Sequence, residues 1–234
     1  MVRGAFACPI ADALVHPTGT TLRLIPTDRN VLHGRLLAVH PSVPARSVSE
    51  FVALAKETPV QLSYASGGPG TPSHLLVELF KSTTGIQMMH IPYKGSAQAV
   101  ADVLAGHVPV TFADALSSLP LIEQGKLRAL GVSTKARLAS APQIPPLAEA
   151  GVPGFDAAAW IMVVAPARTP RDIVSRLHAE LKRISGLPDV QQQLLKFGVM
   201  SIVSPPVEQL QPFINSEIAR WAEVVRRAGI AGSE

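Results

Sequence analysis

The sequence predicts an α/β fold in which helices cover a mostly parallel sheet. Two observations lead to this fold class. Short apolar strands and amphipathic helices alternate from residue 36 to residue 133, a spacing that is typical of βαβ units. Aromatic residues make up only 5% of the chain and apolar residues 47%, so Ala, Val, Leu and Ile must build most of the core, as they do where helices pack on a parallel sheet.

The individual elements follow from periodicity and from end signals. Ser47 and Glu50 form a capping box that begins one helix. Thr71 as N-cap, Pro72 at the first helical position and Gly85 as the stop delimit another. Strands are expected at residues 36–41, 61–65, 87–91, 108–112, 127–133, 160–165 and 200–203. Helices are expected at 47–56, 71–83, 96–105, 115–123, 170–184, 189–197 and 207–227. A proline-rich stretch at 141–153 interrupts the alternation.

Composition and charge exclude several classes of protein. Charged residues make up 16% of the chain, which does not fit a disordered protein. The net charge of +4 is spread out without a block of Lys and Arg, so we expect no nucleic-acid partner. No apolar run reaches the roughly 18 residues of a spanning helix, so we expect no insertion into a membrane. Cys8 is the only cysteine and excludes an internal disulfide. Residues 1–17 make a poor signal peptide because Asp12 interrupts a short, weakly apolar stretch.

The glycine-rich segment at 64–74, Tyr-Ala-Ser-Gly-Gly-Pro-Gly-Thr-Pro-Ser-His, points most directly to a binding site. It joins an expected strand to a helix N-terminus, where free main-chain amides and the helix dipole favour an anion. At the carboxyl end of a parallel strand, such a loop lies where open α/β sheets bind ligands. We therefore expect the amides around residues 66–73 to converge on an anion, although a plain tight turn is the alternative. The candidate residues are Ser66, Gly67, Gly68, Gly70, Thr71 and Ser73.

A carboxylate is the simplest anion for this loop. The nucleotide P-loop requires a lysine after its second glycine, whereas here Thr71 and Pro72 follow Gly70. The dinucleotide fingerprint also fails, because a third glycine is missing and His74 stands nearby instead. We therefore expect no nucleotide cofactor.

Two further strand ends carry polar candidates. Tyr93, Lys94 and Gly95 lie between an expected strand and the next helix, where Lys94 would supply a counter-charge and Tyr93 a wall and a hydroxyl. The alternative for Lys94 is a solvated surface lysine. Asp114 follows a third strand, and two roles stay open for it: it orients a donor or an ammonium group of the ligand, or it caps the next helix.

Catalytic and metal-binding patterns are not recognisable in the sequence. GxSxG and HExxH are missing. His74 and Glu78 stand four residues apart, but a metal site needs at least one more ligand. Cys8 lacks a convincing histidine partner for nucleophilic catalysis. We expect neither enzymatic activity nor a metal.

Several segments together resemble the Bug-type receptors of tripartite tricarboxylate transporters. These are residues 39–48, 64–75, 90–96, 125–130 and 149–155, with Trp221, Arg226 and 228–230 in the closing helix. The resemblance implies a type II periplasmic binding protein fold with two α/β lobes joined by a hinge. Residues 41–155 would form the ligand-binding lobe 2, and 156–234 the C-terminal part of lobe 1, joined by an irregular N-terminal remnant at 1–40.

The resemblance also implies a function. The chain would be a monomeric periplasmic receptor that captures a small organic carboxylate and delivers it to the permease subunits of a membrane transporter. The alternatives are a ligand-sensing module of a signalling system and a degenerate fragment that binds nothing. By position, the six residues of the glycine-rich segment carry over to carboxylate binding, and Tyr93, Lys94, Gly95 and Asp114 are further candidates.

The sequence departs from this family at its start. Family members open with a signal peptide, a strand, a glycine-rich ligand loop and a further βα unit, none of which is recognisable in residues 1–36. A misplaced start codon, a degenerate gene and a truncated variant would each explain the difference. Each charge-assisted hydrogen bond contributes roughly 1.5–3 kcal/mol, so losing two would weaken binding about a hundredfold or more. An incomplete lobe 1 would also expose an apolar face.

Overall fold

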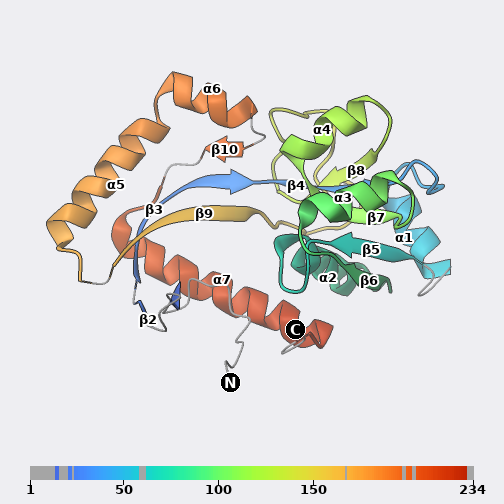
Figure 1. Ribbon diagram of the computed structural model, residues 1–234, viewed down its shortest axis with the longest axis horizontal. Helices are drawn as coiled ribbons and strands as arrows, with labels where there is room; N and C mark the ends of the chain where they lie inside the picture. Colours follow the sequence, from blue (N-terminus) through green and yellow to red (C-terminus); the bar gives the residue numbers. More distant parts are fainter. Residues whose placement is uncertain are drawn as a thin grey trace. The chain divides into compact units, whose positions relative to one another are not determined.

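The computed structural model (Figure 1) describes residues 14–15, 21–22, 24–57, 62–166, 168–196, 199–201 and 204–230. The chain divides into two compact units. The central unit is formed mainly by His33–Ala159, and the terminal unit by the chain before His33 together with Trp160–Leu195 and the residues from Ser201 onward. Cys8 and nearly all of residues 1–17 lie outside the described residues, and so do the expectations about a disulfide and a signal peptide.

The central unit contains a five-stranded sheet in the order β6-β5-β7-β4-β8. Its strands are β4 (Arg35–Val39), β5 (Ser63–Ser66), β6 (Met89–Pro92), β7 (Val110–Asp114) and β8 (Arg128–Val132), and its helices are α1 (Val48–Glu57), α2 (Pro72–Thr84), α3 (Ser96–Leu104) and α4 (Ala115–Glu123). The predicted alternation of strands and helices is confirmed, with most boundaries within two residues.

The prediction of a mostly parallel sheet holds for only part of this sheet. β5 pairs in parallel with β6 and β7, as βαβ units require, but β4 runs antiparallel to both β7 and β8. The reason is that β4 precedes the βαβ run and inserts between two strands of that run. Leu36–Val39 are fully buried. β4 is thus a central strand of this unit, and the expected assignment of residues up to 40 to the other lobe is corrected to a boundary near His33.

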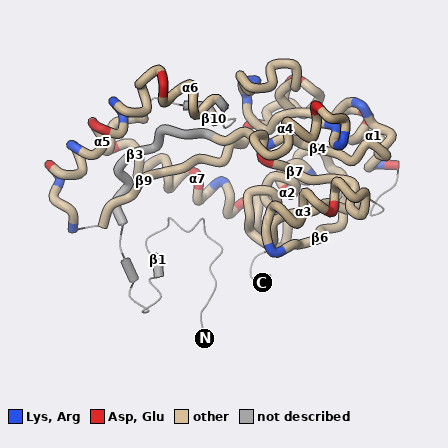
Figure 2. Tube along the Cα trace, turned by 45° about the horizontal axis from the view of Figure 1, so that its top comes forward, with Lys and Arg blue, Asp and Glu red and all other residues tan. Residues whose placement is uncertain are grey.

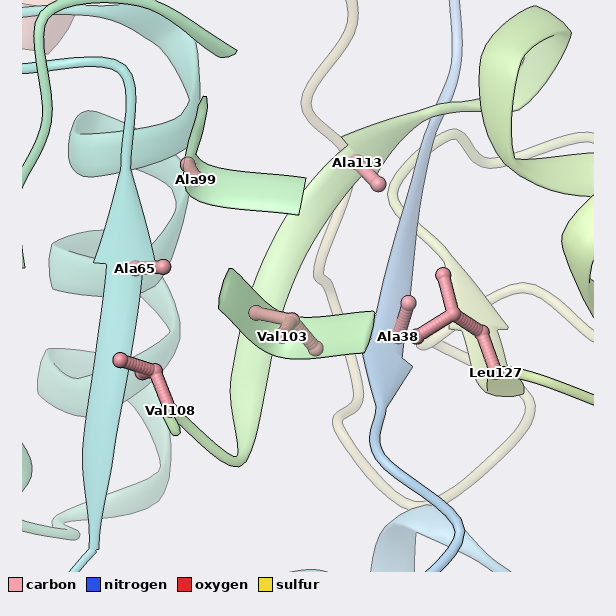
Figure 3. Packing of buried hydrophobic residues seen from close by; sticks show 7 residues of the cluster. All are labelled: Ala38, Ala65, Ala99, Val103, Val108, Ala113 and Leu127. Atoms are coloured by element: carbon pink, nitrogen blue, oxygen red, sulfur yellow. The ribbon is translucent and has the colours of Figure 1, made fainter. Parts of the chain in front are cut away.

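Helices α2 and α3 contact opposite faces of this sheet, as the strand alternation shows. Ala65 on β5 packs with Ala99 and Val103 of α3 in a cluster of small apolar side chains (Figure 3). The preceding residue, Tyr64, points to the other face, where its hydroxyl donates to Glu78 of α2. Successive side chains in a strand point to opposite faces, so a single buried strand supplies contacts to both helices.

A second, three-stranded sheet has the order β10-β3-β9, with β3 (Leu24–His33), β9 (Ala159–Pro166) and β10 (Val199–Ser201). Nearly all of β3 and β9 belongs to the terminal unit, whereas Val199 and Met200 of β10 are counted with the central one. The described residues of the terminal unit also form the helices α5 (Arg171–Ser185), α6 (Pro188–Lys196) and α7 (Val207–Ala228), and two short strands, β1 (Leu14–Val15) and β2 (Thr21–Leu22), pair with each other. The expected elements after residue 160 are confirmed. The expectation of little regular structure before residue 37 is wrong for β3, which has ten residues.

Packing in the terminal unit centres on α7. The indole NH of Trp160 on β9 donates to Glu217 of α7 at 3.0 Å, and the Trp160 ring meets Phe213 edge-on at 5.3 Å. By contrast, α5 carries charges of both signs (Figure 2) and leaves large apolar side chains in solvent. The exposed large apolar residues of this unit are Ile161, Val163, Ile173, Leu177, Ile184 and Leu195. None of the helices in the described part of the chain is long and apolar enough to span a bilayer.

Candidate ligand-binding site

The glycine-rich loop, residues 66–70, joins the buried end of β5 to the start of α2. Gly68 and Gly70 have φ values of 121° and 70°, in the left-handed region that side chains disfavour. Thr71 is the N-cap in an extended conformation, and Pro72 begins the helix without requiring an amide hydrogen bond. The prediction of where this helix starts is therefore confirmed, and the local sequence explains the tight turn.

Most main-chain amides of this loop already donate within it. The Gly67 amide donates to Ser73 Oγ, the Gly68 amide to Ser66 Oγ and the Gly70 amide to His74 Nδ1, each at 3.1 Å. The Thr71 amide donates to the Gly68 carbonyl at 3.3 Å. In this conformation these four amides are therefore not free to receive an anion, because neighbouring polar groups already accept from them.

Two amides in the first turn of α2 stay available. Pro72 has no amide hydrogen, and the first intrahelical donation comes from Leu75 to the Thr71 carbonyl at 3.0 Å. Within the described part of the chain, the amides of Ser73 and His74 have no acceptor. These two groups, at the positive end of the α2 dipole, are the donors that an anion could take.

The second turn, residues 92–96, lies directly against the glycine-rich loop. Ser66 pairs with Pro92 in the parallel β5–β6 ladder, which brings both strand ends to the same edge of the sheet. A Cβ atom at Gly67 would lie 3.0 Å from the amide nitrogen and Oγ of Ser96, and one at Gly68 would lie 3.1 Å from the Tyr93 carbonyl oxygen. The structure thus brings the loop and this turn together, as the sequence predicted, and both glycines are needed for that approach.

The polar side chains of the second turn differ in their availability. The Tyr93 hydroxyl donates to Asp102 of α3 at 2.5 Å, and this hydrogen bond raises the pKa of Tyr93 to about 12. The expected hydroxyl donor is therefore already engaged. Lys94 is exposed and forms no ion pair with any residue that the structure describes. Gly95, with φ 133°, is the N-cap residue of α3, which begins at Ser96 as expected.

Asp114 stands at the N-cap position of α4, but its side chain does not cap that helix. Its carboxylate accepts an ion pair from Arg35 Nη2 at 2.9 Å. Arg35 stands opposite Asp114 in the antiparallel β4–β7 register. Burial lowers the pKa of Arg35, and the Asp114 charge opposes that shift. Arg35 was not among the predicted site residues, because the pair joins two strands that lie far apart in the chain.

A stack of three rings beneath the loop was also not predicted. His74 of α2 lies on His90 of β6, with ring centroids 3.9 Å apart, and Tyr64 lies 4.9 Å from His90 on the stack. Glu78 accepts the Tyr64 hydroxyl at 2.6 Å and Lys81 Nζ at 2.7 Å. Glu78 is thus held by these partners, and within the described ranges no group of three His, Cys, Asp or Glu side chains could hold a metal.

Comparisons with known proteins identify the family and the fold. Residues 25–230 match the family model described as "Tripartite tricarboxylate transporter family receptor". Protein BugT of Bordetella pertussis is 34% identical over 83% of this chain and 59% of its own length. The Rpa4515 structure from R. palustris, solved with adipate, has a TM-score of 0.81 and 33% identity over 95% of this chain and 76% of that one. MatC (Rpa3494) from Rhodopseudomonas palustris with bound malate has a TM-score of 0.74 and 25% identity over 94% of this chain and 76% of that one.

These comparisons confirm the predicted fold class, a type II periplasmic binding protein-like α/β fold. The chain spans about three fifths of the length of the curated relatives it matches. The family match extends from residue 25 to residue 230 and therefore includes the glycine-rich loop and the second turn.

Proposed function

The chain belongs to the tripartite tricarboxylate transporter receptor family, and on this premise we propose that it captures a small organic carboxylate for a transporter of that type. The observation that carries the proposal is the family match across residues 25–230, which includes the loop and second turn at the sheet edge. The adipate and malate in the two R. palustris structures support a dicarboxylate as the guest.

We place the guest's carboxylate at the start of α2. The amides of Ser73 and His74 would hold it, and Lys94 of the adjacent turn would supply the counter-charge. The other predicted residues shape this site: Ser66, Gly67, Gly68, Gly70, Thr71 and Gly95 fix the two turns, Tyr93 forms a wall, and Asp114 neutralises Arg35.

The proposed role extends to compartment, partner and chemistry. The receptor would work in the periplasm, pass its guest to membrane permease subunits and leave that guest unchanged, with its central and terminal units serving as the two lobes. Adipate recovered intact after long incubation supports the absence of catalysis, whereas turnover contradicts it. Vesicles that contain a tripartite permease should take up adipate only when the receptor is added, and uptake without it would rule out the transport role.

Binding is tested by thermal shift and calorimetry with adipate and malate. At about 100 times its dissociation constant, a guest should add about 2.7 kcal/mol to the free energy of unfolding. Adipamide, which has the same length but no charge, should add nothing. Lys94→Ala should weaken binding, and the exposed Lys126→Ala is the matched control. Equal stabilisation by adipate and adipamide, or none by any organic acid, would refute carboxylate capture.

A further inference from the structure

Two histidine rings lie behind the glycine-rich loop, and the proposed function does not use their side chains. His74 is 2% exposed, and its ring lies nearly parallel to that of His90, with an interplanar angle of 12° and a centroid distance of 3.9 Å. The rings come from α2 and β6, which flank β5 and its loop. A buried contact of this kind fixes both rings against the loop backbone.

Each ring forms one hydrogen bond with a group of the loop. His74 Nδ1 lies 3.1 Å from the Gly70 amide, which can only donate, so Nδ1 accepts and carries no proton. His90 Nε2 lies 2.6 Å from Ser66 Oγ, and that oxygen in turn accepts the Gly68 amide at 3.1 Å. The two rings therefore hold the two glycines whose positive φ values shape the loop.

The surroundings of the rings disfavour a positive charge on either. The groups that face them are Tyr64 from β5 and Glu78 and Lys81 from α2. The Glu78 charge is shared with Lys81 at 2.7 Å, and burial raises the pKa of Tyr64, which stays a donor to Glu78. Burial lowers the pKa of His74, and burial followed by repulsion from His74 lowers that of His90 to about 4.

We propose that His74 and His90 are positioning residues, which must both be uncharged to hold the glycine-rich loop in the conformation that receives the carboxylate. The role in carboxylate reception rests on the proposed function. A proton on His74 Nδ1 would set an N–H against the Gly70 amide and remove its acceptor. A proton on either ring would place a cation in contact with the other at 3.9 Å. Protonation in acid would thus loosen the loop and weaken carboxylate binding. The attraction between an imidazolium and an anion would by itself have the opposite effect on binding.

The first test needs no ligand. Backbone amide resonances of Gly68 and Gly70 are followed by NMR from pH 7.5 to pH 4 together with the imidazole resonances. We expect the Gly70 amide to shift with the titration of His74, and that shift to vanish in His74→Asn. The asparagine side-chain oxygen can replace Nδ1 as an acceptor but cannot titrate. A Gly70 amide that ignores the imidazole titration would overturn the proposal.

The second test uses adipate as the probe. His90→Gln retains a hydrogen-bonding group near Ser66 and removes the His90 titration, and His90 supplies no group to the proposed carboxylate site, so this variant should bind adipate about as the unchanged protein does at pH 7.5. At pH 4, about half of the unchanged chains would carry a proton on His90, so their affinity should fall about twofold or more relative to the variant. Comparing the two proteins cancels the protonation of adipate itself.

The outcomes separate this inference from the proposed function. Adipate that binds both proteins with the same pH profile, or more tightly to the unchanged protein in acid, would overturn the positioning role and leave carboxylate capture standing. If neither protein binds adipate while the Gly70 amide still follows His74, the hold of the rings on the loop is supported and the proposed function is contradicted.

Discussion

Removal of the Asp114 carboxylate should destabilise the protein more than its exposure suggests. In Asp114→Ala, Arg35 loses its anionic partner at a position where its side chain is only 10% exposed. Breaking a fully buried ion pair costs about 3–5 kcal/mol. The Asp114 side chain is 39% exposed, and Arg35 Nη1 keeps a 3.4 Å bond to the Phe112 carbonyl, so we expect about 2–3 kcal/mol.

The assay is thermal unfolding followed by circular dichroism. For a chain of 234 residues, a loss of that size should lower the midpoint by about 4–12 °C. The double variant Arg35→Met, Asp114→Ala should lose less stability than the two single variants lose together, because it no longer contains the unpaired Arg35 charge. Glu149→Ala is the control, since its pair with Arg137 is exposed and should contribute below about 1 kcal/mol. An Asp114→Ala protein as stable as the unchanged one, with weakened adipate binding, would instead make Asp114 a contact of the guest.

Three further outcomes are expected. Gly68→Ala should lower the free energy of unfolding, measured by urea titration, by about 2–3 kcal/mol, because φ at this position is 121° and the added Cβ would lie 3.1 Å from the Tyr93 carbonyl oxygen. The control Gly125→Ala, at φ 71° with open space around it, should cost about 1 kcal/mol. Equal losses in the two variants would argue against the close approach of Gly68 to Tyr93. The pKa of His90 falls from 6.5 to about 4 on folding, so between these pH values the unfolded chain binds more protons than the folded one. The free energy of unfolding should therefore be highest above pH 6.5 and decline by about 2–3 kcal/mol towards pH 4. If His90→Gln showed the same dependence of stability on pH, this assignment to His90 would be contradicted. Leu177 on α5 is 44% exposed, so Leu177→Lys should reduce self-association, measured by light scattering, without lowering the midpoint of thermal unfolding. If the unchanged protein stays monomeric at high concentration, this side chain drives no association.

Sequence reasoning succeeded where local chemistry decides the structure. Thr71 with Pro72 fixed the start of α2, and Gly85, at φ 72°, fixed its end, since each position requires a particular residue type. It missed β3, because a strand within residues 24–33 lacks the clean alternation of a half-buried strand. The antiparallel course of β4 was also out of reach, since pairing partners depend on topology rather than on local pattern.

The candidate site shows the same division. The glycine-rich loop and the second turn were both predicted to contribute to the site, and Gly67 and Gly68 leave room for the two turns to lie against each other. The polar partners were not predictable in the same way. Ser66 and Ser73 were expected to bind the guest, but which amide each of them accepts, and that His74 accepts a third, depends on side-chain rotamers. Arg35 acts on the site from a strand that no local motif connects to it, and the hydrogen bond of His90 to Ser66 depends on the pairing of two strands.

The internal hydrogen bonds of the loop lead to a last prediction about where the guest binds. To use the amides of Gly67 or Gly68, a carboxylate would have to break bonds that each contribute about 0.5–1.5 kcal/mol. The amides of Ser73 and His74 require no such exchange. In hydrogen exchange with and without adipate, protection should therefore rise at Ser73 and His74 and stay unchanged at Gly67 and Gly68. If protection instead changed most at the two glycines, the loop would rearrange on binding, because the guest would then replace Ser66 and Ser73 as the acceptor of those amides.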